Sequence, residues 1–243
     1  QANLQGALLD GARLDGAQMI EAYLEGAYLD DTSLVGANLS EAIIRGADLR
    51  YANFRSARLQ QADLEGANLE GAQLVKAQVQ SSNLRMAIFY KAILDEADFR
   101  NTRLYRAVMI GARGAGAIFT KADLSEIHAP NAQFHYAQFD EANMHSANLV
   151  AAELIGSNFT RANLTHANLQ EAHLQGATLS GADLTGSQLD KADIHGATLH
   201  GANLVSVSGL TQAQLDTACV DEQTKLPKEL SRPAPCATAK TKR

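Results

Sequence analysis

The residues with the greatest potential for chemistry are seven histidines and two cysteines. All seven histidines lie in the second half of the chain, and the cysteines stand near its end, at Cys219 and Cys236. These side chains bind zinc or act as bases and nucleophiles when their spacing brings them together. The sequence has no G-x-S-x-G, no H-E-x-x-H, no phosphate-binding loop and no C-x-x-C pair. We therefore expect no catalytic residue, no metal site, no cofactor and no small-molecule substrate, and so no enzyme.

The elements that would have to position such residues are very short, because the sequence repeats every five residues. From Ala2 to Ser206 it divides into 41 pentads without an insertion or deletion. The first position is Ala in 35 pentads, and the third is large and apolar in 39 and holds all seven Phe. Charged residues occupy neither position. This partition separates buried from exposed positions.

A period of five fits neither an α-helix nor a plainly alternating strand. The fifth position holds 16 of the 18 glycines, and glycine lets a chain turn sharply. A chain that turns every five residues and always points its third residue inward closes into a tube. Successive turns of such a tube stack through backbone hydrogen bonds, as in other solenoids.

Stretches such as Ala47-Asp48-Leu49 and Ala67-Asn68-Leu69 carry the most regular pentads. They resemble the A(D/N)LXX motif of the pentapeptide repeat family, and the likeness extends in one register over residues 2–206. The resemblance implies an all-β solenoid, a right-handed quadrilateral β-helix with four pentads per coil. On that basis residues 1–206 form about ten coils, stacked about 4.8 Å apart.

Two third positions, Gly114 and Ala129, lack a large side chain. Beside Ala129 the first position is Ile127, so that small and large residues have exchanged places. Two large third-position residues near Gly114 have the volume to fill its missing side chain, Met109 and Phe119. Either the core repacks at nearly constant volume, or the chain bends or bulges near Arg113 to Asn131, reinforced by Pro130, and shapes a binding face. The sequence allows both.

Residues 207–243 leave the register and are expected to form a C-terminal cap, a short helix followed by an irregular tail. Thr211 and Gln214 have the spacing of a capping box. We expect the helix to end near Cys219 and the cap to cover the end of the tube with apolar side chains from Leu210, Leu215, Ala218, Leu226 and Leu230. Such caps protect the exposed edges of solenoids.

Cys219 and Cys236, the only cysteines, both lie in this expected cap. A disulfide between them would pin the cap and indicate an oxidising compartment, the periplasm or a lumen. Two separate thiols would fit the cytoplasm instead. No apolar run is long enough to span a membrane, so we expect a soluble protein. Separately, we expect a bacterial protein.

Charge is distributed in bands along the chain. The net charge is −6, but residues 45–113 carry eleven basic and seven acidic residues. Some of these charges are predicted to alternate along one edge of the tube at a spacing of 20, namely Glu25, Arg45, Glu65 and Arg85. Others lack partners at a regular spacing, namely Arg100, Arg103, Arg106 and Arg113. Because the net charge is negative, we expect no direct binding to nucleic acid.

Apolar residues also gather on outward positions of the middle band. At a spacing of 20, Ile88 would neighbour Val108, and Tyr90 would neighbour Ile110 and Pro130. Stacked apolar neighbours rimmed by arginine are typical of a protein contact, although an apolar outer ladder can also merely support the strands. The candidate partner-binding residues are Ile88, Tyr90, Ile93, Arg103, Tyr105, Arg106, Val108 and Ile110.

These features favour a non-catalytic scaffold, a rigid rod that binds a partner protein through its outer faces. The resemblance offers an alternative, because some pentapeptide repeat proteins mimic DNA and bind DNA gyrase or topoisomerase IV. Mimicry needs nearly continuous negative charge, which the basic middle band interrupts. Homodimerisation or assembly through an end of the solenoid is a further possibility.

The inward register predicts the effect of one substitution. Leu64→Asp places an unpaired charge in the expected core and should destabilise the fold severely, by more than about 4 kcal/mol. Thermal unfolding of the wild type and the variant measures this loss. Equal melting temperatures would show that the third position does not point inward.

Overall fold

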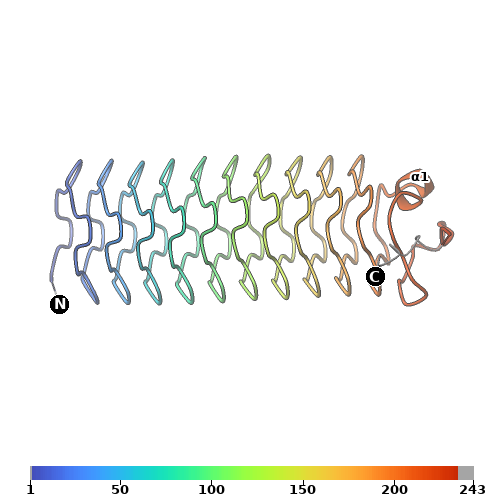
Figure 1. Cartoon of the computed structure of the whole chain (residues 1–243), viewed down its shortest axis with the longest axis horizontal. Helices are drawn as coiled ribbons and strands as arrows, with labels where there is room; N and C mark the ends of the chain where they lie inside the picture. The colour runs from blue at the N-terminus through green and yellow to red at the C-terminus, as the bar shows by residue number, and fades with distance from the viewer. Residues whose placement is uncertain (1, 235–243) are drawn as a thin grey trace, which may run out of the picture.

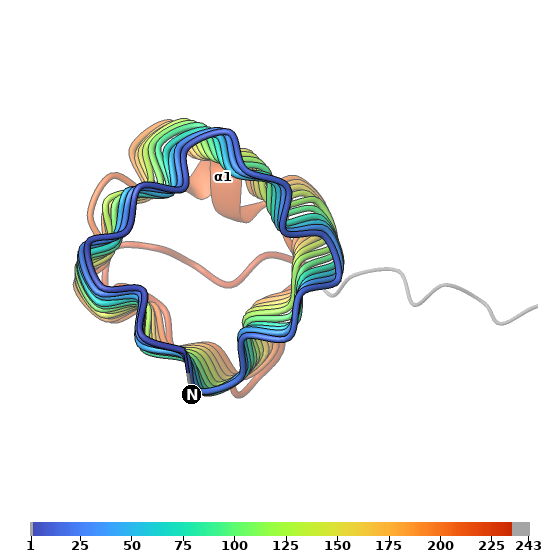
Figure 2. The same cartoon turned by 90° about the vertical axis from the view of Figure 1, so that its left-hand side faces the viewer.

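The computed structural model describes residues 2–234, and these residues form one long tube that ends in a cap (Figure 1). Viewed along its axis, the tube has a four-cornered outline, and the coils lie almost directly over one another (Figure 2). No helix in residues 2–234 has the length and apolar character needed to cross a bilayer.

Each coil is built from four pentads, because the second residue of a pentad pairs with the residue 20 positions later. The pairs are parallel bridges that run from Asn3↔Tyr23 to Gln188↔Ser208. Within residues 2–234 the bridges are isolated, so no face contains an extended strand. Each contact is nevertheless regular: Leu24 N–H donates to the carbonyl of Ile43 at 2.7 Å, and Ile43 N–H donates to that of Ala22 at 2.9 Å.

The bridge columns define four faces, which we number in chain order. Face 1 contains Asn3 and every twentieth residue after it, and faces 2, 3 and 4 start in the same way from Leu8, Arg13 and Gln18. The fourth and fifth residues of each pentad form the turn that follows a face. We call the turn after face 1 corner 1, and number the others likewise.

Every corner turns through a residue with positive φ at the fifth position. In one such turn Ala27 N–H donates to the carbonyl of Leu24 at 3.0 Å, and Gly26 has a φ of 61°. This is the position of a type II turn that favours glycine. Glu41 adopts the same φ of 61° at an equivalent place. The repeat therefore imposes the turn even where the residue carries a side chain.

The first and third residues of the pentads fill the tube. From Met19 onward these positions are buried along the coils, whereas Leu4, Leu9 and Leu14 of the first coil are only partly buried. Four phenylalanines of successive coils stack nearly parallel, with ring centroids 5.0, 5.1 and 4.9 Å apart; they are Phe99, Phe119, Phe139 and Phe159. The core is thus a set of columns rather than a single cluster.

The space at Gly114 is filled from the next coil. A Cβ built on Gly114 would lie 2.9 Å from the Cδ1 and Cε1 atoms of Phe134. The expectation that Met109 and Phe119 fill this space is therefore wrong, because the side chain 20 residues later points directly into it. Gly and Phe are complementary neighbours in one column.

The backbone register is unbroken through this region, so the alternative of a bulge near Pro130 is wrong. Val108 pairs with His128 and Arg113 with Gln133, at the usual spacing. Ile127 is buried in the first position beside the small Ala129. The core therefore accommodates the exchange of small and large side chains at Ile127 and Ala129 without a change in the backbone register.

The cap begins with α1 (Gln212–Leu215). Thr211 and Gln214 form the expected capping box, in which the Thr211 N–H donates to Gln214 Oε1 at 2.8 Å. The helix ends at Leu215 rather than near Cys219, because Cys219 is extended and bridges Thr198. The cap residues Leu210, Leu215, Ala218 and Val220 are buried, and Leu226 and Leu230 pack against the core.

The expected disulfide involves Cys236, which lies outside the described residues. The bond between Cys219 and Cys236 therefore stays a prediction.

The complementarity of Gly114 and Phe134 predicts a coupled pair of substitutions. Gly114→Ala should destabilise the protein by about 1–3 kcal/mol, because the new methyl group overlaps the Phe134 ring. Phe134→Leu removes that ring edge, so the double variant should lose less stability than the sum of the two single losses. Chemical denaturation of all four proteins measures the coupling. Additive losses would contradict the packing.

Candidate functional site

The predicted partner-binding residues surround face 2 in the middle coils. Ile88 and Val108 are paired on face 2 itself. Tyr105 and Arg106 stand on corner 1, before that face, and the register places the remaining corner residues, Tyr90 and Ile110, on corner 2. Ile93 and Arg103 belong to faces 3 and 1, beyond the two corners. The surface is therefore one face with both its edges.

Corner 2 presents an apolar column that is longer than the sequence prediction. Tyr90, Ile110, Pro130 and Val150 follow one another at a spacing of 20. All four are half-buried, and Lys91 Nζ lies 4.9 Å from the centroid of the Tyr90 ring. Val150 was not among the predicted residues, although the same spacing of 20 identifies it.

Corner 1 adds an exposed methionine that the prediction also omitted. Met86 is 56% exposed, and Ile88 on the adjoining face is 36% exposed. Met86 occupies a fifth position, the position that holds 16 of the 18 glycines. A flexible thioether at such a place suits an adaptable contact.

The aromatic ring of corner 1 is held by charged neighbours. The Arg85 Cζ and Arg106 Cζ atoms lie 5.1 and 5.0 Å from the centroid of the Tyr105 ring. The Tyr105 hydroxyl donates to Glu126 Oε1 at 3.3 Å, and Arg106 Nε donates to Glu126 Oε2 at 2.7 Å. The hydrogen bond from Arg106 holds the pKa of Glu126 below its ordinary value, and the pKa of Arg106 is raised in return. Tyr105 is thus fixed in place.

Three of the four arginines without an expected partner at a regular spacing form ion pairs, and the expectation is wrong for Arg106, whose partner lies 20 residues later. Arg100 pairs with Asp98 at 2.5 Å, Arg106 with Glu126 at 2.7 Å and Arg113 with Asp95 at 2.6 Å. Arg103 has no ion pair within residues 2–234.

The expected ladder of alternating charges also pairs differently. Arg45 binds Asp63, 18 residues later, at 2.5 Å, rather than Glu25 or Glu65 in its own column. At Arg45, a fourth position, a diagonal contact to the next coil therefore replaces the expected vertical one. Vertical pairs at a spacing of 20 form instead between fifth positions, as between Arg106 and Glu126.

The histidines form no convergent set. The rings of His145 and His166 meet edge to face, with ring centroids 5.6 Å apart. The His145 ring nitrogens contact Thr165 Oγ1 at 2.8 Å and Ser146 Oγ at 3.2 Å. Across the described part of the chain, no group of three or more histidine, cysteine or acidic side chains is arranged to hold a metal ion.

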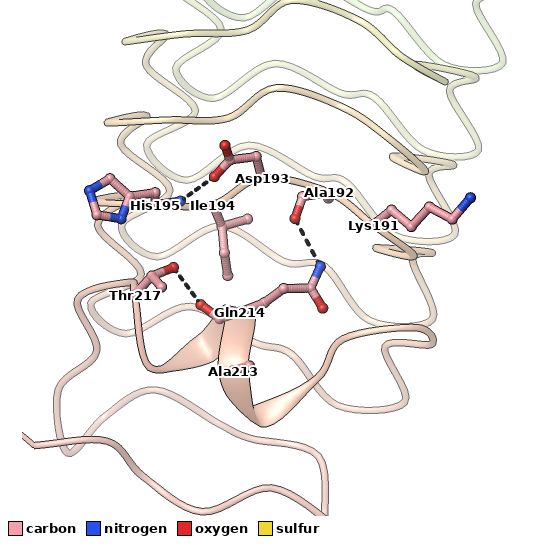
Figure 3. Close-up of a pocket in the computed structure, with 8 residues that line it drawn as sticks. All are labelled: Lys191, Ala192, Asp193, Ile194, His195, Ala213, Gln214 and Thr217. Carbon is pink, nitrogen blue, oxygen red and sulfur yellow. Dashed lines mark hydrogen bonds between the residues drawn. The ribbon is translucent and has the colours of Figure 1, made fainter.

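An open groove of about 500 Å³ separates the last coil from α1 (Figure 3). The Gln214 side chain crosses it and donates to the carbonyls of Leu189 at 3.1 Å and Ala192 at 2.8 Å. Lys191 and His195 extend outward on opposite sides (Figure 3). The two hydrogen bonds from Gln214 attach the cap to the tube. The charged side chains that line the groove do not converge on a common point.

Comparisons with known proteins agree with this architecture. The profile of the family described as pentapeptide repeats matches eight copies, over residues 1–34, 17–54, 52–89, 92–128, 131–165 and 167–204. No curated protein matches the chain.

Among solved structures, the chain is similar to HetL, a pentapeptide repeat protein involved in heterocyst differentiation regulation from the cyanobacterium Nostoc. The identity is 29%, the match covers 91% of this chain and 93% of HetL, and the TM-score is 0.70. A second match, to a pentapeptide repeat protein from the cyanobacterium Cyanothece, has 27% identity over 39% of this chain and 63% of the other, with a TM-score of 0.34. A third, to the plasmid-mediated fluoroquinolone resistance protein QnrB1, has 22% identity over 80% of this chain and 89% of the other, with a TM-score of 0.42.

Proposed function

Because the chain belongs to the pentapeptide repeat family, we propose that it is a non-catalytic rod that binds a partner protein through its middle coils. The observation that carries this proposal is the apolar surface around face 2, in which two exposed side chains adjoin three half-buried ones; we call it the middle patch. Its members are Met86, Ile88, Tyr90, Val108 and Ile110. Large apolar side chains that adjoin one another on a surface are typical of a protein contact.

The geometry of the tube supports a binding rather than a catalytic role. Each coil is held to the next by main-chain hydrogen bonds, so the middle patch is presented by a rigid support. A preorganised surface loses little conformational entropy when a partner binds. The similarity to HetL, a protein involved in regulation, agrees with an action by contact.

Binding to DNA gyrase as a DNA mimic is the alternative. It would use the acidic ends of the rod, since residues 1–44 carry seven acidic residues and one basic residue. The arginines of the middle coils would face the cationic surface that binds DNA and would oppose such docking. We therefore rank it second.

Substitutions in the middle patch test the proposed contact. Tyr90→Ala with Ile110→Ser should leave folding nearly intact and weaken binding of a captured partner by at least about tenfold, or about 1.4 kcal/mol. The measurement is quantitative capture from lysate of the native host, followed by titration of the purified partner.

A matched control removes the same groups elsewhere on the rod. Tyr136→Ala with Ile155→Ser alters corner 3, where Tyr136 is 66% exposed, and should not change capture. Equal binding by both double variants would contradict a contact through the middle patch. Strong inhibition of gyrase supercoiling by the purified wild type would favour the DNA mimic instead.

We also propose that Cys219 and Cys236 form a disulfide. Cys219 lies on a bridge of the last ladder, opposite Thr198, so the bond would tie the end of the chain to the final coil. It would place the protein in an oxidising compartment.

Reduction tests this bond. A reductant should lower the melting temperature, because a disulfide of this kind contributes about 2–4 kcal/mol. The Cys219→Ser variant should melt at the lower temperature with or without reductant. Titration of two thiols in protein purified without reductant would contradict the disulfide.

A further inference from the structure

Side chains of neighbouring coils meet along a recurring diagonal. The fourth residue of a pentad contacts the second residue of a pentad 18 positions later, one coil on. Asp95 meets Arg113 in this way at 2.6 Å, and His135 meets Glu153 at 2.7 Å. Polar pairs use the same diagonal, as Gln80 donates to Asp98 at 2.6 Å. From a fourth position, the diagonal is therefore a recurrent place for a complementary pair.

One diagonal carries two arginines. Arg85 on corner 1 and Arg103 on face 1 are 18 residues apart, and no other such diagonal in the repeat region joins two cations. Both side chains are exposed, and neither forms an ion pair within residues 2–234. A place that elsewhere joins opposite charges here holds two positive ones.

The acids nearest to these arginines in their columns are engaged elsewhere. Glu65, below Arg85, accepts a hydrogen bond from Asn83 Nδ2 at 3.0 Å. Asp123, above Arg103, accepts from Ser125 Oγ at 2.6 Å and from Asn143 Nδ2 at 3.0 Å. The two guanidinium groups thus retain their charge and their donors for a ligand from outside.

The surroundings of this diagonal limit what the ligand can be. Tyr105, held between Arg85 and Arg106, forms a fixed aromatic wall, and the charge of Arg106 is balanced by Glu126. Met86 follows Arg85 directly and Ile88 stands on the adjoining face, both exposed. A ligand that uses the whole site needs an anionic group beside an aliphatic one.

We propose that Arg85 and Arg103 form a carboxylate-binding site that receives an aspartate or glutamate side chain from a partner protein, while a neighbouring aliphatic residue of the same segment packs on Met86 and Ile88. This inference rests on the proposed function and names the chemistry of the partner. Guanidinium groups bind carboxylates through paired, charge-assisted hydrogen bonds. A nucleic acid offers no aliphatic group for the adjoining surface, and the chain's net charge of −6 opposes it.

The test selects short random peptides displayed on phage against the immobilised full chain. The wild type should enrich peptides in which Asp or Glu adjoins Leu, Ile or Val. The Arg85→Gln, Arg103→Gln double variant should lose this enrichment. A second double variant, Arg55→Gln with Arg58→Gln, removes two exposed arginines from corner 3 and face 4 and should retain it; these two also form no ion pair within the described part of the chain.

Synthetic forms of an enriched peptide then give the magnitude. By fluorescence anisotropy, Arg85→Gln with Arg103→Gln should weaken binding at least about tenfold. Replacing the peptide's acid by its amide should weaken binding to the wild type equally and should add little on the double variant. A DNA duplex should not compete, and unchanged circular dichroism spectra confirm that the variants are folded.

The outcomes separate this inference from the proposed function. Enrichment of purely apolar peptides that depends on Tyr90 and Ile110 but not on Arg85 and Arg103 would overturn the carboxylate site and leave the middle patch intact. Acidic peptides bound equally by both arginine double variants, or competition by DNA, would also overturn it. If neither the arginine pair nor the Tyr90 and Ile110 pair affects enrichment, or no peptide is enriched, both proposals fail.

Discussion

The main-chain hydrogen bonds between successive coils are the interaction on which the rest of this structure depends. They join each pentad to the one 20 residues later, and they leave the side chains free to sort into inward and outward sets. These hydrogen bonds form only if the chain makes the same turn at every corner. The turn is present even at residues such as Glu41 and Tyr51, whose positive φ carries a steric cost.

Because the ladder places coils in register, the outer surface behaves as a lattice with fixed neighbours. Residues on one face repeat at 20, and contacts from a corner to the preceding face of the next coil repeat at 18. The residue at one position therefore determines which contacts its neighbours at spacings of 18 and 20 can form. Arg85 forms part of the proposed carboxylate-binding site only because the register places Arg103 beside it.

The sequence predicts the architecture well because every pentad repeats the same two features: the positions that point inward and the position at which the chain turns. It predicts the stacking of Ile88 on Val108 for the same reason. The sequence does not predict which neighbour a long side chain contacts, because that depends on the direction in which the side chain extends. Phe134 fills the space at Gly114 from the following coil, and Arg45 leans diagonally to Asp63, because a side chain has a direction along the axis that the period does not reveal. Val150 extends the apolar column through the same period, one coil beyond Pro130.

Four pentads per coil have a consequence for how this rod can change in evolution. A duplication of a whole coil lengthens the tube and leaves every face aligned, so a surface on one side survives. Insertion of a single pentad keeps the inward alternation of Ala and Leu, yet it turns everything after the insertion by one face. A pentad gained between Arg85 and Arg103 would move the second arginine to another side of the rod while the repeat continues. The core columns would also gain new neighbours at that one level, so the spacing of this region serves both binding and packing.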